Sequence, residues 1–159
     1  EVESKNGAKR CWMTTGSPGD CVKLAINAIL DKDELPDLVI SGINHGPNLG
    51  ADILYSGTVS CAMEGAMMGY QSNATSLASL RNDYEDFHYA AAFVAELLNR
   101  LDKYKIPPKT ILNINMYLFL FGLERINIAI KVIDSFLMVR QEKLPVNFLY
   151  LLSKFLFLF

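Results

Sequence analysis

Along the chain, segments typical of buried strands alternate with segments whose apolar residues recur at helical spacing. A short apolar run at 38–40 suits a strand buried on both faces of a parallel sheet, and further strands are predicted over 74–78 and 110–115. Between these runs, apolar residues recur at helical spacing after residue 58 and over about 84–104. This order predicts an α/β fold: a three-layer, Rossmann-like domain with a mostly parallel sheet and right-handed crossovers.

An earlier helix is predicted from its start signals. Ser17 is a suitable N-cap, Pro18 occupies the first helical position, and Asp20 follows the cap by three residues as in a capping box. The apolar stripe that follows consists of Val22, Ala25, Ile26, Ile29 and Leu30. The chain therefore enters its first strand from a helix.

The loop after the strand at 38–40 is rich in Gly and Asn. It contains Asn44 and Asn48, whose carboxamides offer both an oxygen and an NH2 group. A carboxamide oxygen can ligate a hard divalent cation, and its NH2 can donate to phosphate. The glycines Gly42, Gly46 and Gly50 permit backbone angles that other residues avoid. The alternative is a structural loop whose Asn residues only form local turns.

Ser56, Gly57 and Thr58 open a helix of small residues. The first N–H groups of a helix have no partner inside it and favour anions, so these residues form a candidate phosphate cradle. No Lys follows the glycine, so this is not a Walker A loop. The alternative is an ordinary helix cap. The small residues of the helix predict close packing, and core positions are predicted for Met63, Met67 and Met68.

The stretch SGINHGPNLGADILYSGTVSCAMEG resembles the signature of the SurE family of stationary-phase survival proteins. GSPGDCVKLA and LNIN resemble an upstream segment and a later strand of the same family, so the resemblance spans about 14–116. It implies a metal-dependent nucleotidase that hydrolyses nucleoside 5' or 3' monophosphates, and in some members polyphosphate. It further implies a divalent cation (Mg or Mn), a homo-oligomer, Asn44 as a metal ligand, and phosphate binding by Asn48, Ser56, Gly57 and Thr58.

The chain also departs from the family pattern. The adjacent Asp-Asp-Gly that ends the family's opening strand and holds the metal is missing, as is a Ser ligand further along. We therefore expect a fragmentary, N-terminally truncated SurE-like domain over 1–116 with impaired activity and no assigned catalytic residue. The alternative is a catalytically inactive phosphate- or nucleotide-binding module, or an assembly subunit.

Composition narrows the class of protein. Hydrophobic residues make up 51% of 159 positions, enough for one globular core. The net charge is −2 and no basic block occurs, so polymeric nucleic acid is not an expected partner. Three cysteines without CxxC spacing favour a reducing cytoplasm, and the first ten residues lack the apolar core of a signal peptide.

Residues 117–159 differ from the rest in being rich in Phe and Leu and poor in Gly. They are expected to form an atypical apolar tail. Three alternatives are a divergent folded C-terminus, a membrane-associated tail, and AT-rich sequence translated in a wrong frame, of which the third is favoured. The last apolar run is shorter than the ~20 residues of a membrane-spanning helix, so a membrane partner is not expected.

Overall fold

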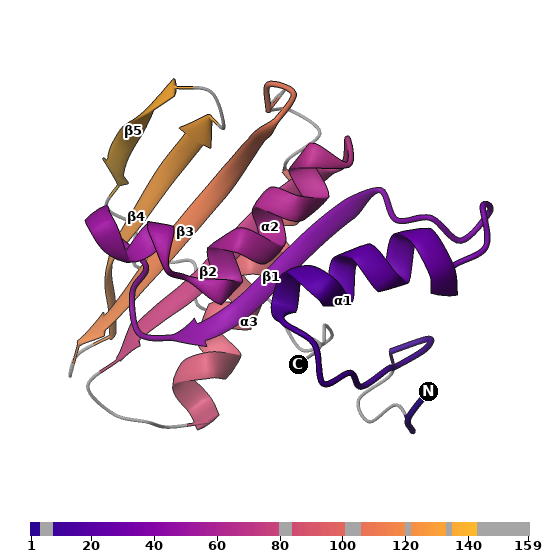
Figure 1. Cartoon of the computed structure of the whole chain (residues 1–159). Coiled ribbons are helices and arrows are strands. Elements are labelled where there is room, and N and C mark those ends of the chain that lie inside the picture. Colours follow the sequence, from indigo (N-terminus) through magenta and orange to yellow (C-terminus); the bar gives the residue numbers. More distant parts are fainter. Residues whose placement is uncertain (4–7, 80–83, 101–105, 120–121, 133–134, 143–159) are drawn as a thin grey trace.

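A five-stranded sheet organises the chain in the computed structural model, which describes residues 1–3, 8–79, 84–100, 106–119, 122–132 and 135–142. Its strand order is β1-β2-β3-β4-β5 (Figure 1). The strands are β1 (Leu38–His45), β2 (Gln71–Ser79), β3 (Thr110–Phe119), β4 (Gly122–Val132) and β5 (Ser135–Glu142). The first three pair in parallel, whereas β4 and β5 are antiparallel to their neighbours. The predicted α/β fold with a parallel sheet is confirmed.

The sheet continues beyond residue 116, where the atypical tail was predicted to begin. Strand β3 runs on to Phe119, and β4 and β5 extend the sheet by two further strands. The last apolar runs, over 143–159, lie outside the described residues. A domain boundary at residue 116 therefore stays a prediction.

Among the described residues, no helix is both long and apolar enough to cross a membrane.

Helix α1 (Pro18–Leu24) begins as its sequence predicts. The Ser17 hydroxyl accepts a hydrogen bond from the Asp20 N–H at 3.3 Å, and the Ser17 N–H donates to the Asp20 carboxylate at 2.8 Å. This reciprocal pair is a complete capping box. The α-helix ends at Leu24 and continues as a π-helical turn, η1 (Ala25–Ile29), so the predicted stripe spans two elements.

Helix α2 (Gly57–Met67) lies close against the sheet because its facing residues are small. A Cβ added to Gly65 would lie 2.6 Å from the Ser72 hydroxyl and 2.9 Å from Val39, which leaves no room for a side chain. Val59, Ala62 and Ala66 pack with residues of β2 and β3. Met63 and Met68 contact the core as predicted, but Met67 is 53% exposed, so its predicted core position is wrong.

Helix α3 (Tyr84–Leu98) covers the opposite face. It ends earlier than the predicted limit of residue 104, and 101–105 lie outside the described residues. Its Ala90, Phe93 and Val94 pack on Leu77, Leu112, Ile114 and Met116. Ile111, whose side chain points the other way from Leu112, packs with α2. The helices therefore form two outer layers around the sheet.

The two crossovers of the parallel sheet have opposite hands. The chain advances from β1 to β2 to β3 in one direction, so crossovers of the same hand would place α2 and α3 on the same face. They lie on opposite faces instead. The prediction of right-handed crossovers is therefore wrong for one of them. The reason is that α3 packs on the apolar face of β3, opposite the face that α2 covers.

Candidate functional site

Strand β1 continues past the predicted run at 38–40 and includes Asn44. Its register with β2 shifts between Ser41 and Asn44, after which Asn44 pairs with Ser76. Gly42 makes this possible: its φ is +118°, and an added Cβ would collide with the carbonyl oxygen of Thr75. Asn44, predicted to lie in a loop, is therefore held at the end of a strand.

Asn48 fastens the loop after β1 to the neighbouring strands. Its backbone N–H donates to the side-chain oxygen of Asn115 at 2.7 Å, and its carbonyl oxygen accepts from the Asn113 amide at 2.8 Å. Its own amide donates to the Ser76 hydroxyl at 2.7 Å. Asn48 is buried, with 6% of its surface exposed. One of its two amide hydrogens is thus already engaged, and its predicted role toward phosphate remains a prediction.

Sequence reasoning assigned no role to Asn113, Asn115 or Ser76, although all three hold the loop. Asn113 and Asn115 alternate with Leu112, Ile114 and Met116, so both amides lie on the α2 face of β3. Each is fully buried and keeps one polar atom without a hydrogen-bond partner among the described residues: Asn113 Oδ1 and Asn115 Nδ2. Two polar residues at alternate positions of an apolar strand were the signal that could have found them.

The N-terminus of α2 presents donors that nothing in the described structure engages. Ser56 is the N-cap, and its hydroxyl accepts from the Val59 N–H at 3.1 Å. The N–H groups of Gly57 and Thr58 and the Thr58 hydroxyl have no hydrogen-bond partner among the described residues. Gly57 is exposed and Thr58 is half-buried. The cap predicted as the alternative is present, and it leaves these three donors free.

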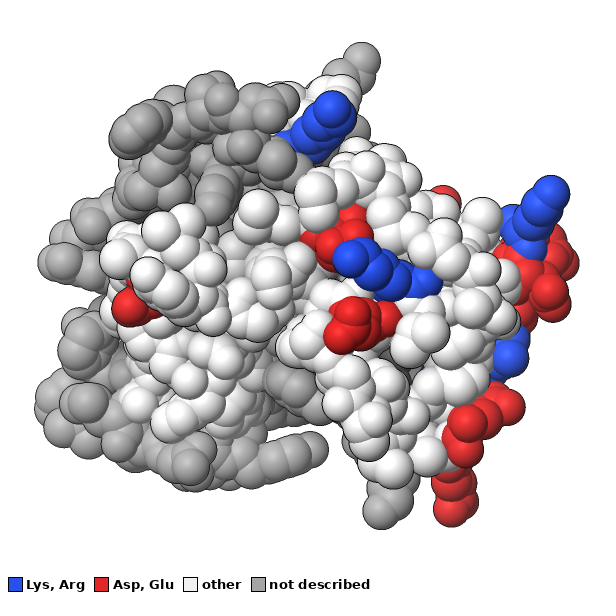
Figure 2. All heavy atoms as spheres, viewed as in Figure 1, with Lys and Arg blue, Asp and Glu red and all other residues white. Residues whose placement is uncertain are grey.

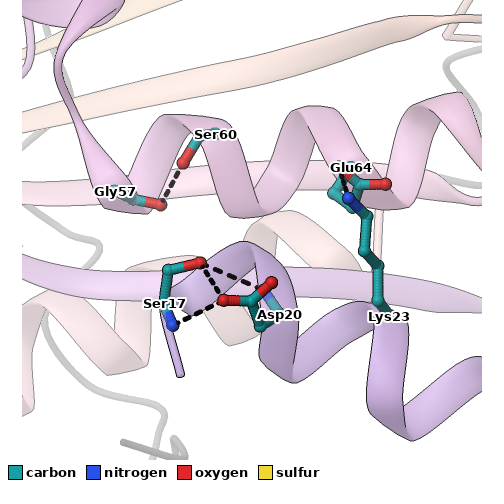
Figure 3. A network of polar contacts seen from close by, with 6 residues as sticks. All are labelled: Ser17, Asp20, Lys23, Gly57, Ser60 and Glu64. Atoms are coloured by element: carbon teal, nitrogen blue, oxygen red, sulfur yellow. Dashed lines mark hydrogen bonds and ion pairs between the residues drawn. The ribbon is translucent and has the colours of Figure 1, made fainter. Parts of the chain in front are cut away.

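Helices α1 and α2 start side by side (Figure 3). A Cβ added to Gly57 would lie 3.3 Å from Pro18, and Lys23 Nζ lies 3.3 Å from Glu64 Oε2.

Helix α1 carries charges of both signs. Hydrogen bonds from the Ser17 hydroxyl and N–H, and to a smaller extent the charge of Lys23, hold the pKa of the exposed Asp20 below its usual value. Figure 2 shows Lys and Arg scattered over this face, without a continuous basic patch.

Asn44 alone does not make a metal site. Its amide nitrogen donates to the carbonyl oxygen of Gly46 at 2.8 Å, which leaves its oxygen as one neutral candidate ligand. The described part of the chain contains no group of three or more His, Cys, Asp or Glu residues placed to hold a metal. Because hard divalent cations are usually held through one or two carboxylates, the described residues do not fit a complete site.

These features define a class: a three-layer α/β protein with carboxamides in β1, in β3 and in the loop after β1, and with a free helix N-terminus following that loop. Within this class, the chain belongs to the SurE family, because the family model described as Survival protein SurE matches residues 1–134. The match passes residue 116, where the resemblance read from the sequence ended.

Curated relatives agree with this membership. A 5'-nucleotidase SurE from Thermosynechococcus vestitus is 52% identical over 107 residues, which are 67% of this chain and 39% of the relative. One from Synechococcus elongatus is 53% identical over 109 residues, 69% of this chain and 40% of the relative. One from Carboxydothermus hydrogenoformans is 48% identical over 116 residues, 73% of this chain and 43% of the relative. The chain thus spans less than half the length of these relatives.

The solved structure of a SurE protein from Aquifex aeolicus is also similar. Its TM-score is 0.59 at 33% sequence identity, and the match covers 81% of this chain and 57% of that one. The shared fold is consistent with family membership.

Proposed function

We propose that this chain binds the phosphate group of a nucleoside monophosphate at the N-terminus of α2, as part of a SurE-type phosphomonoesterase. The observation that carries the proposal is the set of three free donors at Gly57 and Thr58 in a chain of this family. Two adjacent N–H groups and a hydroxyl suit the oxygens of a phosphoryl group, and the helix dipole favours its negative charge.

The remaining predicted residues have distinct parts in this proposal. Ser56 shapes the cradle by capping the helix, and Asn48 holds the approaching loop, with one amide hydrogen left for phosphate. Asn44 contributes one neutral oxygen toward a divalent cation, Mg or Mn, whose chemistry would be to polarise the phosphoryl oxygens and activate water. Homo-oligomer formation and action on polyphosphate stay predictions from the family resemblance, and a cytoplasmic location stays a prediction from the cysteine pattern.

We expect this chain on its own to turn over little substrate. No adjacent Asp pair occurs in its sequence, and the described residues do not form a complete metal site. The same observation favours the second candidate function, a binding module or assembly subunit without activity. The phosphomonoesterase and the binding module both require phosphate to bind at α2, whereas an assembly subunit does not, so binding and turnover must be measured separately.

Nuclear magnetic resonance of the 17.8 kDa chain can test the binding step. The amide signals of Gly57 and Thr58 are followed during titration with adenosine monophosphate, and then with adenosine as the control without phosphate. We expect saturable shifts at both amides with the monophosphate only. Shifts that are equal for adenosine, or that avoid the start of α2, would contradict a phosphate cradle there.

Phosphate release from the same samples, with Mg or Mn added, separates the two candidate functions. Binding with measurable release supports the phosphomonoesterase in this chain. Binding without release supports the impaired or inactive form.

A further inference from the structure

Helices α1 and α2 lie side by side and run in the same direction. Their first turns touch where Pro18 meets Gly57, and further along Lys23 pairs with Glu64 at 3.3 Å (Figure 3). The two contacts occur in the same order along both helices, which fixes the parallel arrangement. Positions between the two contacts therefore lie at the same level on the two helices.

Each helix carries a cysteine between these contacts. Cys21 follows Pro18 by three residues, and Cys61 follows Gly57 by four, so each lies on the side of its helix that holds the first contact. Cys61 packs with Val22, the residue after Cys21. The Cys21 thiol donates to the Ser17 carbonyl oxygen of its own helix at 3.4 Å, so it must rotate away from Ser17 to reach Cys61. The helices are close here because Gly57 has no side chain.

The two thiols differ in their surroundings. Burial raises the pKa of the Cys61 thiol, a hydrogen bond with Ser41 opposes this rise, and the charge of Cys21 adds to it. Cys61 is only 7% exposed, whereas Cys21 is exposed to solvent. One thiol of the pair is thus open to a reagent and the other is shielded.

We propose that Cys21 and Cys61 form a reversible disulfide that joins α1 to α2. Oxidised glutathione, a small disulfide, is a sufficient oxidant. The exposed Cys21 thiolate attacks one of its sulfurs, forming a mixed disulfide and releasing one glutathione thiolate. Cys61 then gives its proton to the released glutathione thiolate and attacks the Cys21 sulfur, releasing the second glutathione as a thiolate that takes a proton from solvent. Two protein thiols are oxidised and one glutathione disulfide is reduced to two thiols.

This bond would fix the start of α2 against α1. Gly57, one of the proposed phosphate donors, lies one helical turn from Cys61 and contacts α1 directly. The disulfide itself does not depend on the proposed function, because it rests only on the packing of the two helices.

The test is oxidation of the full chain with oxidised glutathione, followed by alkylation under denaturing conditions and peptide mass mapping. The reduced chain has three free cysteines, and we expect the oxidised chain to retain only Cys11. The mass map should show one linked peptide pair containing Cys21 and Cys61. A reductant should restore all three thiols.

Three variants make the result specific. In Cys61→Ala we expect a lasting glutathione adduct at Cys21, and in Cys21→Ser we expect neither adduct nor link. Cys11→Ser is the matched control and should still form the link. A native chain that stops at a Cys21 adduct, or that joins Cys21 to Cys11, would overturn the proposal.

Discussion

The backbone N–H of Asn48 donates a 2.7 Å hydrogen bond to the side chain of Asn115, which is 67 residues away in sequence. Asn113 donates a second hydrogen bond, to the Asn48 carbonyl oxygen. Together these two bonds form a clamp on the loop that contains Asn48. A loop that follows one strand is thereby held by a strand two positions further along the sheet. The clamp positions the chain just before the short 3-10 helix η2 (Gly50–Leu54), which leads to the start of α2.

Replacing Asn115 with Leu should therefore destabilise the protein. The change keeps the branching of the side chain but leaves the buried Asn48 N–H without a partner, which costs about 1–3 kcal/mol. Urea unfolding measures this loss, and hydrogen exchange at Asn48 should accelerate in the variant.

Asn73→Leu is the matched control. Asn73 is also buried, but neither polar atom of its side chain has a hydrogen-bond partner among the described residues. Removing an unsatisfied amide should be neutral or stabilising. Equal destabilisation by both substitutions would mean that the clamp contributes nothing beyond packing.

Gly65→Ala should destabilise the contact of α2 with the sheet. The new methyl group would lie 2.6 Å from the Ser72 hydroxyl and 2.9 Å from Val39, so the helix must move outward. Overpacking of this kind costs about 1–3 kcal/mol. In Gly19→Ala, by contrast, the nearest atom is the Ser17 hydroxyl oxygen at 3.9 Å, so that variant should be neutral or slightly more stable. Thermal unfolding of the pair gives the comparison.

The capping box of α1 should make stability depend on pH in the acid range. The folded pKa of Asp20 is lowered, first by the Ser17 hydroxyl, so ionised Asp20 stabilises the fold above its unfolded pKa of about 4. This contribution is lost as the pH falls through the folded value. The difference in unfolding free energy between the native chain and Asp20→Ala should therefore shrink below about pH 4. In a Ser17→Ala background, the pH-dependent part of that difference should largely disappear, and its persistence would assign the effect to another group.

The sequence was sufficient to predict elements defined by local signals. The start of α1 follows from Ser17, Pro18 and Asp20, which interact within one turn. The first parallel strand follows from the apolar run at 38–40, and the start of α2 follows from Ser56. Each of these features depends on residues close together in the chain.

Features that depend on distant partners could not be predicted in the same way. β1 continues through the bulge after Ser41 because β2 resumes pairing with Asn44, and Asn48 is buried because Asn113 and Asn115 lie beneath it. The hand of the crossovers depends on which face of β3 each helix covers. The one sequence signal for these contacts is the alternation of apolar and Asn residues in β3, which indicates that one face of this strand is apolar and the other polar.

The last prediction concerns the Thr58 hydroxyl at the start of α2. Thr58→Val removes this donor while keeping the shape of the side chain, and no partner among the described residues is left unpaired. If the hydroxyl meets a phosphate oxygen, losing one hydrogen bond to a charged group costs about 1.5–3 kcal/mol. The affinity for adenosine monophosphate should then fall about 10- to 100-fold, with an unchanged melting temperature. Ser60→Ala is the control, because the Ser60 hydroxyl donates to the Gly57 carbonyl oxygen at 2.9 Å and points away from the free N–H groups. An equal loss of affinity in both variants, or an unaltered affinity in Thr58→Val, would show that Thr58 has no direct contact with phosphate.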